Sequence, residues 1–252
     1  MFSLDAAVKS KRKTTSKTRT TATAPKVMEG KITEYGNLIT FQNFTIKKGE
    51  SEISVDYPIA GDPTLVNPIR SYIVKAITGK TDATAASLST PKNLLTSTIR
   101  KYKSKGYWGM TDGSVFTLNI KVVFKNDKVI TIENSGYEYE GGAHGTGWDR
   151  FITYLLSDGT YLSYDMIPSF KTLKPYILSS LEKVFGIPAY KFNDEGIYVN
   201  ELPDGLPYIN ENGVNFTYGE YEIGPYSLGL PTATIPFSTM RILCSGKALN
   251  FF

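Results

Sequence analysis

The chain has 252 residues, with 28 Lys and Arg against 24 Asp and Glu, one cysteine and one histidine. This length can bury a sizeable core as one large domain or two small ones, and no apolar run approaches the roughly 20 residues of a membrane-spanning helix. A single cysteine, Cys244, cannot form an internal disulfide, and its apolar surroundings predict a buried, inert thiol. A structural zinc site needs about four ligands, mainly Cys and His, so we expect no metal, and we expect no cofactor.

The basic residues are concentrated at the N-terminus, and the rest of the chain is close to neutral. We therefore predict no nucleic-acid-binding domain. Residues 1–27 have no sustained apolar pattern and are predicted to form a disordered basic tail, either a solvated linker or a tether to a membrane surface or nucleic acid. A secretory signal would place an apolar core after its positive charges, and none is visible here.

Residues 28–112 are predicted to form a companion α+β region. Asn67-Pro68 is typical of an N-cap followed by proline at the first helical position, and this helix would end near Gly79. Thr90-Pro91 repeats the pattern, with Gly106 as the end of a second helix. Two strands precede these helices, at Asn37–Ile46 and Glu52–Tyr57.

Residues 113–252 are predicted to form a second α+β region, in one compact unit with the first. Strands are expected at Val115–Phe124, Val129–Asn134, Tyr137–Glu140, Phe151–Leu156 and Val214–Tyr218. A helix over Leu173–Phe185 would end at Gly186, and a closing strand or short helix is expected at Ala233–Leu243. The predicted fold class is α+β, with antiparallel sheets and about three helices packed on them.

The most informative stretch is Tyr137–Gly145, which alternates aromatic and acidic residues and then forms a glycine-rich turn carrying His144. In an extended chain Tyr137 and Tyr139 share one face, and Glu138 and Glu140 share the other. Glycine allows backbone angles and close approaches that other residues resist. A strand, a glycine turn and a second strand could present a binding surface.

Enzymatic interpretations have little support in the sequence. A nucleophilic hydrolase would need a serine or cysteine beside His144, and no Gly-x-Ser-x-Gly elbow is present. A glycosidase needs two carboxyl groups that face each other across a sugar. Glu138 and Glu140 would instead stand side by side on one strand face, as in a solvated strand. A carbohydrate-active hydrolase using Glu138 or Glu140 stays open as an alternative.

Several of these residues carry a family resemblance. Tyr137–Gly145, followed by Asp158-Gly159 and Leu162–Ile167, resembles the Gly-Gly-Ala-His-Gly signature of a bacterial extracytoplasmic domain of the RsiV and PdaC type, the domain of unknown function 3298. Gly213–Gly229 resembles the closing motif of that family, and Ile53–Pro58 is similar to its 4163-like companion domain. The resemblance covers roughly residues 37–243.

The resemblance implies a non-catalytic binding module of the cell envelope. The expected partner is a lysozyme-like, glycan-cleaving enzyme or the cell-wall glycan itself, and the expected location is the cell envelope or the outside of the cell, with a targeting segment not visible in this chain. A structural or virion-associated protein stays open as a further alternative. The predicted contact residues lie in the glycine turn and in a second loop, with Tyr139 and Tyr226 as the aromatic contacts. They are Tyr139, Glu140, Gly141, Gly142, His144, Gly145, Pro225, Tyr226, Ser227 and Gly229.

Overall fold

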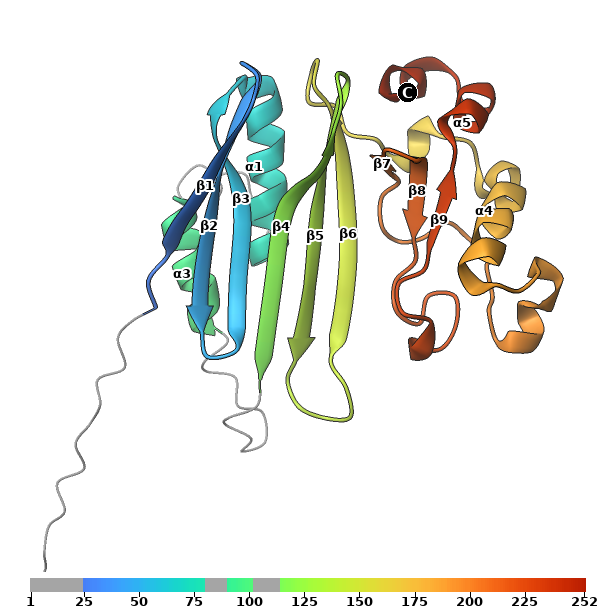
Figure 1. Ribbon diagram of the computed structural model, residues 1–252, viewed down its shortest axis with the longest axis horizontal. Coiled ribbons are helices and arrows are strands. Elements are labelled where there is room, and N and C mark those ends of the chain that lie inside the picture. Colours follow the sequence, from blue (N-terminus) through green and yellow to red (C-terminus); the bar gives the residue numbers. More distant parts are fainter. Residues whose placement is uncertain (1–24, 80–89, 102–113) are drawn as a thin grey trace, which may run out of the picture.

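The computed structural model describes residues 25–79, 90–101 and 114–252, which form two β-sheets with helices packed on each (Figure 1). The predicted α+β class is confirmed. A six-stranded sheet runs in the order β1-β2-β3-β4-β5-β6, and a three-stranded sheet in the order β7-β8-β9. The strands are β1 (Met28–Tyr35), β2 (Ile39–Lys48), β3 (Ser51–Gly61), β4 (Val115–Lys125), β5 (Val129–Tyr139), β6 (Thr146–Leu155), β7 (Tyr208–Asn210), β8 (Gly213–Thr217) and β9 (Thr232–Ile235).

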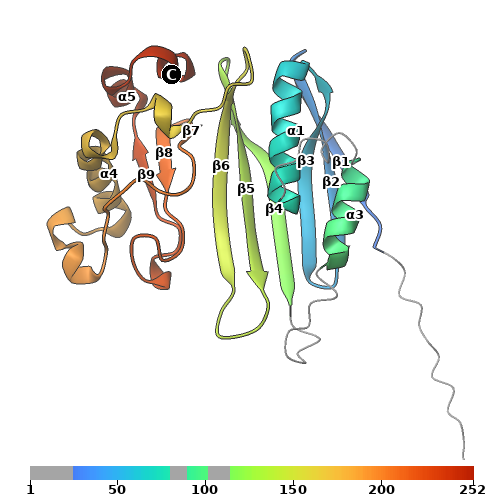
Figure 2. The same cartoon turned by 180° about the vertical axis from the view of Figure 1, so that it is seen from behind.

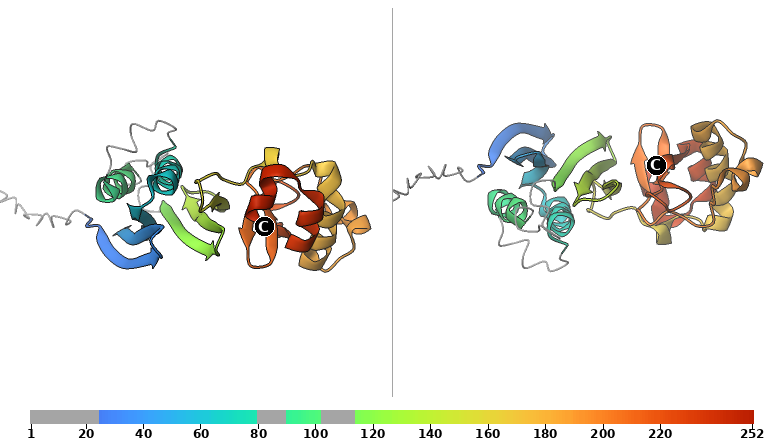
Figure 3. Two further views of the ribbon diagram at one scale, coloured as in Figure 1. Left: turned by 90° about the horizontal axis from the view of Figure 1, so that it is seen from above. Right: turned by 90° about the horizontal axis from the view of Figure 1, so that it is seen from below.

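All neighbouring strands are antiparallel except β3 and β4, which pair in parallel. Parallel neighbours need a crossover connection, and the segment between them contains helices α1 (Pro63–Thr78) and α3 (Pro91–Lys101). Both helices cover one face of the six-stranded sheet (Figures 2 and 3). This sheet therefore combines strands from both predicted regions, β1 to β3 from residues 28–112 and β4 to β6 from residues 113–252.

Helix α1 begins five residues earlier than predicted. Asp62 is the N-cap, accepting a hydrogen bond from the Thr64 backbone N–H at 2.9 Å, and Pro63 takes the first helical position. The predicted start at Asn67-Pro68 is wrong, because an equivalent pair, Asp62-Pro63, lies five residues earlier and Pro68 is accommodated inside the helix. The predicted end is confirmed, with Gly79 in the left-handed conformation at φ 69°.

Proline inside α1 leaves one backbone carbonyl without its helical donor. Pro68 has no N–H, so the Thr64 oxygen cannot accept the usual bond from four residues ahead. Gly159, in the turn after β6, packs against this oxygen so closely that a Cβ on it would lie 2.1 Å away. The Tyr154 hydroxyl in turn donates to the Pro68 carbonyl at 3.4 Å. These contacts join the start of α1 to the end of β6.

Other predicted boundaries agree with the structure. The Thr90 hydroxyl accepts a bond from the Asn93 N–H at the start of α3, as predicted, although the predicted end at Gly106 lies outside the described residues. Helix α4 (Phe170–Phe185) ends at Gly186 as predicted, although it begins three residues before the predicted Leu173. The segment Ala233–Leu243 holds both alternatives, the end of β9 and helix α5 (Phe237–Leu243). Cys244 follows α5 and is buried, which raises the pKa of its thiol.

Several strand predictions differ from the structure. Strand β6 begins at Thr146, five residues before the predicted Phe151, and the short strand β7 was not predicted. Strand β1 was not predicted, because at the edge of the sheet most of its residues are exposed and show no apolar alternation. The predicted strands Val129–Asn134 and Tyr137–Glu140 are one continuous strand, β5, which Gly136 does not interrupt. A Cβ on Gly136 would lie 2.2 Å from the Trp148 ring, so this glycine serves close packing rather than a turn. Residues 1–24 of the predicted basic tail lie outside the described residues.

The second sheet packs on the face of the first sheet that the helices leave open. In β5, Ile130 and Ile132 face the core between the sheet and α1, so Thr131 between them points to the opposite face. Thr131 and Thr153 are fully buried there, with their hydroxyl oxygens 2.8 Å apart. The Thr131 hydroxyl donates to the Ile209 carbonyl at 2.7 Å, and the Ile209 N–H donates to Thr153 Oγ1 at 2.9 Å. Both backbone groups of this β7 residue are therefore satisfied by the first sheet.

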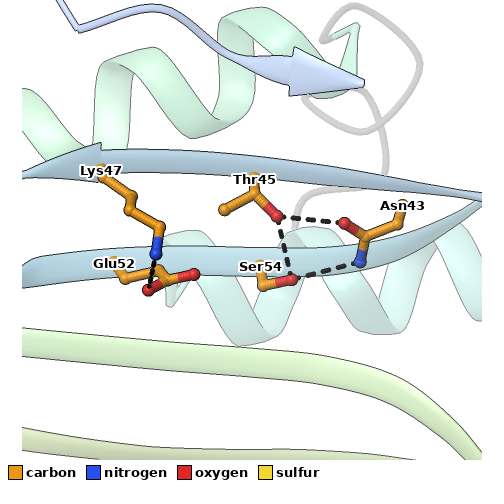
Figure 4. A network of polar contacts seen from close by, with 5 residues as sticks. All are labelled: Asn43, Thr45, Lys47, Glu52 and Ser54. Carbon is orange, nitrogen blue, oxygen red and sulfur yellow. Dashed lines mark hydrogen bonds and ion pairs between the residues drawn. The ribbon is translucent and has the colours of Figure 1, made fainter. Parts of the chain in front are cut away.

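The open face is polar over β2 and β3. On β2 and β3, Asn43, Thr45 and Ser54 form a closed set of side-chain hydrogen bonds, next to the Lys47–Glu52 ion pair at 2.8 Å (Figure 4). The side-chain amide of Asn43 also donates to Asp56 at 2.9 Å. These groups satisfy one another, so this part of the sheet is a hydrated surface and needs no covering layer.

We predict that Gly159→Ala destabilises the fold more than Gly186→Ala. Both glycines have nearly the same positive φ, 71° and 69°, but only Gly159 lies against another backbone. Gly186→Ala should lower the free energy of unfolding by about 1 kcal/mol because of the left-handed conformation. Gly159→Ala should lower it by about 1–3 kcal/mol more, because the added Cβ clashes with Thr64. Urea denaturation of both variants measures the difference, and equal losses would contradict the close contact.

We also predict that Thr131→Val or Thr153→Val destabilises the protein by about 1–3 kcal/mol, because each leaves one Ile209 backbone group buried without a partner. Thr146→Val is the matched control, since Thr146 is exposed on β6 and the change there should stay within about 0.5 kcal/mol. Thermal unfolding of the three variants tests this. If Thr131→Val and Thr153→Val lower the stability no more than Thr146→Val does, the hydrogen bonds to Ile209 do not stabilise the fold.

Candidate functional site

The two loops that the sequence singled out lie against each other in the structure. His144, in the loop between β5 and β6, stacks on Tyr226 with ring centroids 4.3 Å apart. Tyr221 completes the group, with its hydroxyl 3.2 Å from His144 Nε2 and its ring centroid 5.7 Å from that of Tyr226. These three side chains, here called the aromatic cluster, come from segments about 80 residues apart in the chain.

The loop that carries His144 is held by its glycine conformations and by side-chain hydrogen bonds to its own backbone carbonyls. Gly141 and Gly142 have φ values of 102° and 105°, which residues with a Cβ rarely adopt. The Tyr139 hydroxyl closes the loop by donating to the Gly142 carbonyl at 3.0 Å. His144 Nδ1 lies 3.0 Å from the Gly145 carbonyl, which only accepts, so Nδ1 carries the proton and in the neutral ring Nε2 can accept from Tyr221.

Gly145 is buried and packed tightly. A Cβ there would lie 2.4 Å from the Tyr137 ring and 2.5 Å from the Glu138 carbonyl oxygen. The Tyr226 hydroxyl donates to the Gly145 carbonyl at 3.4 Å. Gly145 therefore lets the loop lie flat on β5 and gives the second loop a backbone acceptor.

Tyr221 lies in a strained backbone conformation. It occupies the third position of the turn Gly219–Glu222, which the Glu222 N–H closes by donating to the Gly219 carbonyl at 3.2 Å. Its φ is 64°, and within the described residues no other non-glycine residue has a positive φ. An aromatic residue in this region costs roughly 1–2 kcal/mol. Its side chain is 60% exposed, so burial in the core does not offset that cost.

An acidic group, Glu220, lies beside the aromatic cluster. Glu220 accepts a hydrogen bond from the Gly147 N–H at 3.0 Å and so joins the turn to the start of β6. Removal from water raises the pKa of the Tyr226 hydroxyl, and the negative charge of Glu220 adds to the rise. The two segments that build the site, residues 129–149 and 192–240, contain acidic residues but no lysine or arginine.

The other predicted site residues take peripheral positions. Glu140, Pro225, Ser227 and Gly229 are exposed around the cluster. Glu138, the partner of Glu140 in the hydrolase alternative, is a half-buried residue within β5, whereas Glu140 lies in the loop after it.

Sequence reasoning missed two residues as members of the site, Tyr221 and Glu220. Tyr221 was visible only as one of many tyrosines, because nothing in the sequence marks a non-glycine residue for positive φ. The Glu220 carboxylate accepts a hydrogen bond from the Gly147 N–H in a distant strand, and no pattern in the sequence predicts this contact.

Neither a metal site nor a membrane span is found in the part of the chain that the structure describes. There, no three His, Cys, Asp or Glu side chains lie close enough together to hold a metal ion. In the same residues, no helix is both long and apolar enough to cross a membrane.

Comparison with solved structures supports the fold. A DUF3298 family member from Bacteroides fragilis is 18% identical, with a TM-score of 0.69 over 90% of this chain and 96% of that one. A DUF3298 family protein from Pseudomonas aeruginosa is 17% identical, with a TM-score of 0.59 over 90% of this chain and 95% of that one. At these identities the likeness concerns the fold alone. No curated protein sequence matches the chain.

A family model described as "Protein of unknown function (DUF3298)" matches residues 165–238. The match includes Tyr221 and Tyr226, whereas the His144 loop precedes it. The matched segment supplies two of the three rings of the aromatic cluster, and both solved structures that share the fold are themselves described as DUF3298 family proteins.

Proposed function

We propose that this protein is a non-catalytic binding module of the bacterial cell envelope that recognises a basic, lysozyme-like glycosidase through the aromatic cluster. The observation that carries the proposal is Tyr221, an exposed aromatic side chain held at φ 64° beside His144 and Tyr226. Strain of this kind is concentrated at functional sites, where the surrounding structure maintains it. Exposed tyrosines on loops also supply much of the binding energy at protein interfaces.

The charge around the cluster favours a cationic protein over a neutral glycan. Glu220 and Glu222 flank Tyr221, and the segments that build the site have no lysine or arginine. A surface of one sign attracts a partner of the opposite sign and speeds its association, and added salt weakens this effect. An uncharged sugar polymer could donate hydrogen bonds to these carboxylates but would gain no long-range attraction from their charge.

The envelope location and the RsiV and PdaC type belong to the same proposal. They rest on the resemblance of Tyr137–Gly145 and Gly213–Gly229 to the motifs of that type, and of Ile53–Pro58 to the 4163-like companion. The DUF3298 match over residues 165–238 supports the second of these motifs. The cell wall is the setting in which a protein of this type meets glycan-cleaving enzymes.

We predict that Tyr226→Ala weakens binding to a basic lysozyme about 30-fold, the effect of truncating a central interface tyrosine. Tyr190→Ala is the matched control, because Tyr190 is 80% exposed outside the cluster, and its affinity should not change. Calorimetric titration at two salt concentrations measures both effects, and the parent protein should bind more weakly at the higher one. Equal losses in the two variants, or no binding by the parent, would contradict the proposal.

We further predict that Tyr221→Gly weakens the same binding while costing little or no folding stability. Glycine adopts positive φ without strain, which offsets the lost ring contacts. Chemical denaturation and titration of one protein sample separate the two effects. A variant that unfolds easily and binds normally would show that Tyr221 has a structural role only.

The binding module and the hydrolase alternative predict different results for Glu138→Gln and Glu140→Gln. If the protein is a binding module, both variants should change lysozyme affinity only modestly, and the parent should not cleave peptidoglycan or oligomers of N-acetylglucosamine. Cleavage by the parent that one of the two Gln variants abolishes would replace the binding module with an enzyme.

A further inference from the structure

Glu222 connects the strained turn to the body of the second sheet. Both oxygens of its carboxylate accept backbone hydrogen bonds, Oε2 from the Gly219 N–H at 2.5 Å and Oε1 from the Asp204 N–H at 2.7 Å. The first bond lies within the turn that contains Tyr221, and the second reaches a segment 18 residues away in the chain. Charge-assisted bonds of this kind are roughly twice as strong as neutral ones.

The segment around Asp204 is itself held in place. The Tyr164 hydroxyl lies 2.9 Å from the Pro203 carbonyl oxygen and 2.6 Å from that of Gly205, on either side of Asp204. Burial raises the pKa of the Tyr164 hydroxyl, so it remains protonated and can donate. Glu222 is therefore bonded to a segment that a half-buried tyrosine fixes to the 3-10 turn Tyr164–Met166, which precedes α4.

The position is an unfavourable one for a carboxylate. Glu222 is half-buried, which raises the pKa of its carboxyl group, and the negative charges of Asp204 and Glu201 raise it further. The two N–H groups offset part of this effect. A carboxylate in such surroundings lowers the stability of the fold, as the positive φ of Tyr221 does. The two unfavourable features lie at adjacent residues.

We infer that Glu222 is a positioning residue for the proposed binding site: its carboxylate joins the Gly219–Glu222 turn to the Asp204 segment and so holds Tyr221 in the left-handed conformation, with its ring against His144. Without these two bonds the turn relaxes to an unstrained conformation and the Tyr221 side chain leaves the cluster. This inference rests on the proposed function for its purpose, but the arrangement itself can be tested without any partner.

His144 is the only histidine in the chain, so its imidazole gives a single set of NMR signals. In the parent, these signals should be displaced by the stacked Tyr226 ring and show magnetisation transfer to Tyr221. Glu222→Ala should remove the transfer to Tyr221 and shift the His144 signals, whereas Glu222→Gln, which keeps one carbonyl oxygen, should retain part of both. Glu211→Ala, at an exposed acid in the turn before β8, should change neither.

Unchanged His144 signals and an undiminished contact with Tyr221 in folded Glu222→Ala would overturn the inference. If that variant does not fold, Glu222→Gln decides by the same criterion. The binding assay adds a second test: Glu222→Ala should weaken affinity for a basic lysozyme more in the parent than in a Tyr221→Gly background, where only the loss of the negative charge remains. Absence of lysozyme binding would contradict the proposed function and leave the NMR result valid.

Discussion

The arrangement of the molecule depends on one buried contact, the pair of threonine hydroxyls that bonds both backbone groups of Ile209. Thr131 and Thr153 lie on neighbouring strands, and neither is exposed to solvent. Buried hydroxyls and amides are costly unless paired, so each sheet satisfies polar groups of the other. Stacking of Phe151 on Tyr208, with centroids 3.8 Å apart, adds an apolar contact beside them. Together these contacts fix where the second sheet lies on the first.

The aromatic cluster is a consequence of that placement. His144 belongs to the connection between β5 and β6, and Tyr221 and Tyr226 belong to the loop after β8, so the rings meet only because the two sheets pack as they do. Glu220 adds a direct bond from the second sheet's loop to the Gly147 backbone. The candidate site is thus built from segments of both sheets, and hydrogen bonds between those segments hold its side chains in place.

Local strain and local charge coincide at one turn. Tyr221 has an unfavourable backbone angle, and Glu222 is a half-buried carboxyl group with acidic neighbours that raise its pKa. Neither feature adds to the core, and both are maintained by hydrogen bonds from the surrounding segments. Costs of this kind are commonly found where a structure presents a side chain for recognition.

The sequence by itself determined the fold class, most strand positions and the glycine ends of α1 and α4, because those features depend on local periodicity and on the φ angles that only glycine adopts easily. It also identified both loops that meet at the site. Only the tertiary structure decided that α1 starts at Asp62, that the exposed edge strand β1 exists, and that Tyr221 and Glu220 join His144 and Tyr226. Those outcomes depend on contacts between segments far apart in the chain, for which residue spacing carries no information.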